Sequence, residues 1–68
     1  MNDRQFDTAM NLLNGLIENN MVSYRESWEI EGAIIDIYNN DGDGFLHSME
    51  DHLQKIANQI LRTIGFAS

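Results

Sequence analysis

Apolar side chains recur every three or four residues along three segments of this 68-residue chain, and no other feature constrains its fold as strongly. This spacing places them on one face of an α-helix, which has about 3.6 residues per turn. Proline, which interrupts helices, does not occur in the chain. The pattern predicts helices at about 3–19, 24–38 and 48–64, and therefore an all-α, compact three-helix domain that spans 1–68.

The residues at the predicted helix ends are typical of helix caps. Asn2 or Asp3 is suited to begin the first helix, and Ser23 followed by Glu26 forms a capping-box pattern for the second. Gly65 is placed as a stop for the third helix, because glycine tolerates the left-handed backbone that ends many helices.

The second helix is expected to be the central one, since its apolar residues occupy more than one side. These residues are Trp28, Ile30, Ala33, Ile34, Ile35, Ile37 and Tyr38. Tryptophan is commonly a core or interface residue. Because Trp28 lies close to the start of the helix, we expect it to be half exposed.

The size and charge of the chain narrow its classes of function. A domain this small is only marginally stable, and without cysteine it has no disulfide to support it, so a bound metal or a protein partner becomes attractive. A net charge of −7 argues against direct binding to nucleic acid or to an anionic membrane. No apolar stretch is long enough to span a bilayer. We therefore expect a cytoplasmic protein that binds cations or basic partners.

Oxygen-bearing residues alternate along the segment between the second and third helices, which begins Asn39-Asn40-Asp41-Gly42-Asp43-Gly44. Calcium takes six to eight oxygen ligands, and a tightly curled loop points every second residue inward. The segment from Asn39 to Glu50 resembles the twelve-residue calcium-binding loop of the EF-hand family. Gly44 falls where that loop makes its sharp turn, and Leu46 falls on its apolar anchor position.

The resemblance implies calcium as the cofactor and a specific ligand set. Side-chain oxygens come from the first, third and fifth positions, a backbone carbonyl from the seventh, a residue at the ninth that often acts through water, and both carboxylate oxygens from the twelfth. In this chain those positions hold Asn39, Asp41, Asp43, Phe45, His47 and Glu50.

The chain departs from the family in three respects. Its first ligand, Asn39, is an asparagine in place of the usual aspartate, which removes one negative charge. The apolar stripe of the third helix is shifted by about two residues, so that helix must pack differently. A second loop is missing, so a paired site requires a homodimer through 45–47 or another protein. The alternative interpretation is an acidic surface turn without metal.

Three classes of function are consistent with the sequence. The first is a small calcium-binding module, structural or sensory, that acts through protein–protein contacts. The second is a metal-independent acidic inhibitor or adaptor that docks on a basic surface. The third is a helical subunit of a larger assembly. An enzyme is not expected, because no nucleophile, perturbed acid or phosphate-binding loop is recognisable, and two histidines without cysteine are a poor zinc site.

Overall fold

Three long helices and one single-turn helix form the protein, as seen in a computed structural model that describes residues 1–40 and 44–66. The long helices are α1 (Asp3–Glu18), α2 (Tyr24–Asn40) and α4 (Asp51–Thr63), and the short one is α3 (Gly44–His47). The described residues contain no strand. The predicted all-α, three-helix architecture is confirmed.

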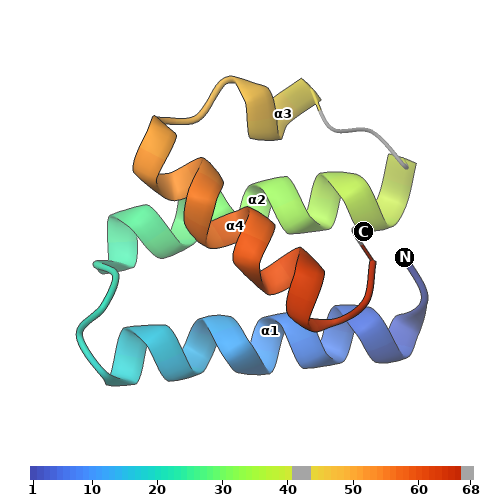
Figure 1. The fold of residues 1–68 in the computed structure, drawn as a ribbon, viewed down its shortest axis with the longest axis horizontal. Coiled ribbons are helices and arrows are strands. Elements are labelled where there is room, and N and C mark those ends of the chain that lie inside the picture. The colour runs from blue at the N-terminus through green and yellow to red at the C-terminus, as the bar shows by residue number, and fades with distance from the viewer. Residues whose placement is uncertain (41–43, 67–68) are drawn as a thin grey trace.

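The helices are arranged around a single core (Figure 1). α1 and α2 lie side by side and run in opposite directions, while α4 crosses them diagonally. α3 packs on α2 and α4 but not on α1. The starts of α2 and α4 lie at the same end of the molecule, so the chain between α2 and α4 runs back along the length of α2.

Two capping boxes fix the starts of α1 and α2. The side chain of Asn2 accepts a hydrogen bond from the backbone N–H of Gln5 at 2.8 Å, and Gln5 Oε1 accepts from the backbone N–H of Asn2 at 3.0 Å. Ser23 and Glu26 exchange the equivalent pair at 2.9 and 3.1 Å. Each box satisfies backbone donors that a helix start would otherwise leave unpaired. The caps predicted at Asn2 and Ser23 are confirmed.

α1 and α4 end in the same backbone conformation. Asn20 (φ 59°) and Gly65 (φ 80°) both adopt the left-handed backbone just past the helix. The residue after each one donates its backbone N–H to the helix, from Met21 to Leu16 at 2.9 Å and from Phe66 to Leu61 at 3.0 Å. Both ends are therefore Schellman motifs, and the predicted stop at Gly65 is confirmed.

The core is made of apolar residues from all four helices and from the turns beside them. Its buried members are Ala9, Leu13, Val22, Ile30, Ala33, Ile34, Ile37, Leu46, Met49, Leu53, Ala57, Ile60 and Leu61. Each long helix contributes one alanine that is at most 1% exposed. Small residues at such positions let helix backbones approach one another closely.

Aromatic contacts join the start of α1 to the end of α2. The rings of Phe6 and Tyr38 stack with their centroids 4.3 Å apart, and the Tyr38 hydroxyl donates a hydrogen bond to the Asp3 carboxylate. This hydrogen bond raises the pKa of the Tyr38 hydroxyl, because it favours the protonated form.

The structure corrects the sequence prediction between α2 and α4. α2 continues to Asn40, two residues past its predicted end, and α4 begins at Asp51, three residues after its predicted start. The intervening α3 was not predicted. Leu46 and Met49 are 7% and 8% exposed, so burial of these two side chains holds the segment against the core. A helix beginning at Ser48 is replaced by a turn whose last residue, Glu50, is extended.

Candidate functional site

The predicted calcium ligands are distributed over separate elements. Asn39 lies in the last turn of α2, the backbones of Phe45 and His47 belong to α3, and Glu50 immediately precedes α4. The segment through which a paired site was expected, 45–47, is part of α3 and is helical. The remaining predicted ligands, Asp41 and Asp43, lie outside the described residues.

The structure does not bring Asn39 and Glu50 together. Glu50 Oε2 lies 3.5 Å from His52 Nδ1, and His52 Nε2 lies 2.9 Å from Glu26 Oε2, so Glu50 sits beside the first turns of α2. Asn39 is at the other end of that helix, about 20 Å further along its axis at about 1.5 Å per residue. In this arrangement the first and last predicted ligands cannot hold the same ion, since calcium–oxygen distances are about 2.3–2.6 Å.

Across 1–40 and 44–66, no three His, Cys, Asp or Glu side chains converge on a point where a metal ion could bind. The described carboxylates are all exposed or half-buried. Calcium binding through 39–50 therefore stays a prediction of the sequence.

Glu26 joins the starts of α2 and α4. One carboxylate oxygen caps the Ser23 backbone N–H, and the other meets the His52 ring. The Ser23 hydrogen bond, followed by the one from His52, lowers the pKa of Glu26 below its usual 4.5. The same contact with Glu26 raises the pKa of His52 above 6.5, and the charges of Glu50 and Glu29 add to this shift.

The stability contributed by this ion pair is expected to depend on pH in both directions. The raised pKa of His52 adds stability that is complete below 6.5 and is lost as pH rises through the folded-state value. The lowered pKa of Glu26 adds stability that is complete above 4.5 and is lost as pH falls through its folded-state value. The difference in Tm between the wild type and His52→Gln should therefore be largest between pH 4.5 and pH 6.5, where both contributions are complete. A difference that is constant across the acidic and neutral range would contradict the pairing.

A row of exposed side chains follows the outer face of α2, opposite the core. Tyr24 and Trp28 are 79% and 78% exposed, and Ile35, two turns further on, is 37% exposed. We call Tyr24, Trp28 and Ile35 the α2 stripe. The prediction that Trp28 is half exposed underestimated its exposure, and Ile35 does not belong to the core. The apolar residues on a second side of α2 were the signal of this surface in the sequence, but they do not reveal which side faces solvent.

Acidic residues border the α2 stripe. At 100° per residue, Glu31 falls on one edge of the stripe, and Glu29 and Asp36 fall on the other. Arg25 shares that second edge and offsets one of these charges. The stripe is therefore an aromatic and apolar surface with a net negative border.

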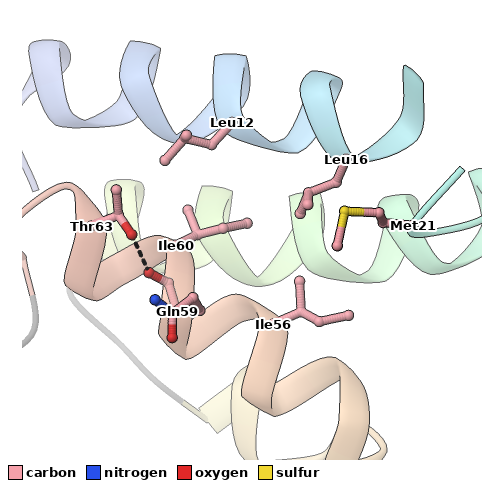
Figure 2. Close-up of a pocket in the computed structure, with 7 residues that line it drawn as sticks. All are labelled: Leu12, Leu16, Met21, Ile56, Gln59, Ile60 and Thr63. Carbon is pink, nitrogen blue, oxygen red and sulfur yellow. Dashed lines mark hydrogen bonds between the residues drawn. The ribbon is translucent and has the colours of Figure 1, made fainter. Parts of the chain in front are cut away.

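A second apolar surface is a groove between α1 and α4, with a volume of about 240 Å³. In Figure 2, Leu12 and Leu16 point into it from α1, Ile56 and Ile60 from α4, and Met21 closes one end. Gln59 and Thr63 complete the lining, which we call the α1–α4 groove. No carboxylate lines it. Gln59 also lines an adjoining hollow with Lys55, Asn58 and Arg62, so two of the four basic residues of the chain stand beside the groove.

No helix within 1–40 and 44–66 combines the length and the apolar character needed to cross a membrane. Comparison of the chain with protein-family models, with curated proteins and with solved structures found no match.

Proposed function

We propose that this protein is a metal-independent interaction module that binds a partner protein through the α2 stripe. The observation that carries this proposal is the exposure of Tyr24 and Trp28, one turn apart on the face of α2 that points away from the core. Tryptophan and tyrosine are enriched among the residues that dominate binding energy at protein interfaces. Neither ring is buried in the core, so both present their surface to a contact outside it.

The border of the stripe defines the chemistry of the partner. Glu29, Glu31 and Asp36 favour a surface that is apolar at its centre and basic at its edges, because opposite charges at the rim of an interface guide association and select partners. An amphipathic helix with lysine or arginine along both edges has this chemistry. The cysteine-free composition is compatible with the reducing cytoplasm, where we propose that the contact forms.

The proposal is tested with a synthetic helical peptide that has leucines on one face and lysines along both edges of that face. Trp28 is the only tryptophan of the chain, so its fluorescence reports directly on the stripe. We expect a saturable blue shift in the presence of a metal chelator, which weakens as salt is raised, since exposed charges are screened. A peptide with glutamates in place of the lysines should bind far more weakly.

Variants then assign the binding to the stripe. With a labelled peptide, Trp28→Ala should weaken binding by at least about thirtyfold, the loss that accompanies an interface residue worth about 2 kcal/mol. Phe66→Ala is the matched control, because Phe66 is 38% exposed but lies outside the stripe. Both variants should keep the Tm of the wild type within a few degrees. Equal binding by Trp28→Ala and the wild type would overturn the proposal.

Calcium binding by the 39–50 segment is a second candidate function, favoured by the spacing of its oxygen ligands. For one ion to use both Asn39 and Glu50, the Glu50 carboxylate must leave His52 and move toward the end of α2. Calcium is therefore expected to act by rearranging the chain between α2 and α4.

The rearrangement gives calcium binding a distinctive signature. Calcium should raise Tm in a saturable way that magnesium does not reproduce. It should also lower the pKa of His52, because Glu50 is one of the charges that raise it. Glu50→Gln should abolish the calcium response, while Glu31→Gln, an equal change of charge outside the segment, should preserve it. An unchanged Tm at millimolar calcium would exclude this function.

A further inference from the structure

The protein itself has a surface with chemistry like that proposed for the partner, apolar at its centre and basic at an edge. The α1–α4 groove is apolar at its centre, and its outer edge on α4 carries Lys55 and Arg62. Both side chains lack an ion pair within the part of the chain that the structure describes. The lining of the groove is thus uncharged and its rim on α4 carries two positive charges, with Asp51 one turn before Lys55, whereas the protein as a whole is negative.

The residues of α1 directly beside the groove are uncharged. At 100° per residue, the outer positions beside Leu12 and Leu16 hold Thr8, Asn11, Gly15 and Asn19. The acidic residues of α1, Asp3, Asp7 and Glu18, fall about 20° or more beyond Asn11 on the side away from the groove, and Arg4 lies one turn before Thr8. An approaching acidic surface thus meets uncharged residues directly beside the groove on α1 and two basic side chains on α4.

The size of the groove also suits the α2 stripe. Its volume of about 240 Å³ exceeds the roughly 150 Å³ of an apolar cavity that binds benzene, so it has room for an aromatic ring. Trp28 is the largest exposed apolar group of the chain. Met21, which is 67% exposed at one end of the groove, has a flexible thioether side chain that adapts to the shape of an inserted ring.

We propose that copies of this chain associate head to tail, with the α2 stripe of one copy seated in the α1–α4 groove of the next. This inference rests on the proposed function, since it uses the same stripe. The two surfaces are different, so the contact is heterologous, and each copy that donates its stripe still presents an open groove. Association therefore continues past a dimer into a ring or a short filament.

The buried area predicts a weak contact. Each large aromatic side chain buries about 150–250 Å², so two of them with Ile35 form an interface at or below the lower limit of about 1,200 Å² in total that stable complexes bury. We expect a dissociation constant weaker than about 1 μM, which salt weakens further because the rim charges are screened.

Sedimentation velocity of the full chain over a range of concentrations tests the proposal. The wild type should shift from monomer to a series of larger species as concentration rises. Trp28→Ala, which lacks the largest side chain of the stripe, should remain monomeric. Lys55→Gln/Arg62→Gln, which lacks the basic rim of the groove, should also remain monomeric. Thermal melting checks that both variants are folded. We expect both to fold, because the substituted side chains are exposed.

Mixing the two variants provides the decisive comparison. Trp28→Ala keeps an intact groove, and Lys55→Gln/Arg62→Gln keeps an intact stripe, so an equimolar mixture should form a one-to-one dimer and nothing larger. Arg4→Gln/Asn14→Asp is the matched control, because it changes the net charge by the same amount at two exposed residues that line neither the groove nor the stripe, and it should associate like the wild type.

Either of two results overturns the head-to-tail contact: a wild type that stays monomeric at every concentration, or variants that associate without being mixed. If the wild type is monomeric but the basic peptide still binds Trp28, self-association fails and the proposed function stands. If the peptide fails as well, both fail.

Discussion

Ile34→Ala is expected to lower Tm by roughly 10–30 °C. Ile34 is fully buried in the middle of α2, and removing most of its side chain from a packed core costs about 2–5 kcal/mol. In a domain of this size each kcal/mol changes Tm by about 4–8 °C. The whole domain is stabilised by only about 3–10 kcal/mol, at about 0.05–0.15 kcal/mol per residue. A loss of about 5 kcal/mol on substitution therefore leaves the variant largely unfolded at room temperature.

Ile35→Ala is the matched control, because it makes the same chemical change at the next residue. Ile35 is 37% exposed on the α2 stripe, so its substitution leaves a smaller cavity or none, and we expect a loss below about 1 kcal/mol. Chemical denaturation followed by circular dichroism measures both variants. Equal losses for the two would show that α2 presents a different face to the core.

Ala33→Leu should also destabilise the domain strongly, for the opposite reason. Ala33 is 1% exposed, and a leucine there adds three carbons to a core that is already filled. Overpacking of this kind costs about 1–3 kcal/mol, because neighbouring helices must separate or side chains must adopt strained rotamers. The expected decrease in Tm is roughly 5–20 °C.

Glu31→Leu serves as the control for Ala33→Leu. Glu31 is exposed on the same helix, where a leucine meets no neighbour, and its effect on stability should stay within about 0.5 kcal/mol. Thermal melting of the two variants measures both changes in Tm. If Ala33→Leu melted like the wild type, the helices would not pack closely at this alanine.

The sequence was a reliable guide wherever the interactions are local. Asn2 with Gln5 and Ser23 with Glu26 bond to each other within a single turn, so a reader of the sequence needs no knowledge of distant residues to place them. Gly65 is placed by its own backbone preference. The three long helices followed from apolar spacing alone, for the same reason.

The segment between α2 and α4 was predicted less well, because its conformation depends on contacts with distant parts of the chain. Leu46 and Met49 are buried against other helices, and Glu50 is held near Glu26 through His52. None of these contacts follows from the spacing of oxygen ligands in 39–50. One signal was present in the sequence: the shifted apolar stripe of the third helix indicated that it packs differently from an EF-hand exit helix. Its buried residues include Leu53, Ala57 and Ile60, and the helix packs against α1, α2 and α3.

The sequence by itself determined the helical class, the starts of α1 and α2, the end of α4 and the acidic charge of this protein, since these depend on residues close together in the chain. Only the tertiary structure decided which side of α2 is buried, and thus that Trp28 faces solvent while Ile34 does not. It also decided that the α1–α4 groove exists, because its walls come from helices far apart in the sequence. The physical reason is that burial is settled by which elements meet, and an amphipathic pattern with apolar residues on two sides leaves that choice to packing.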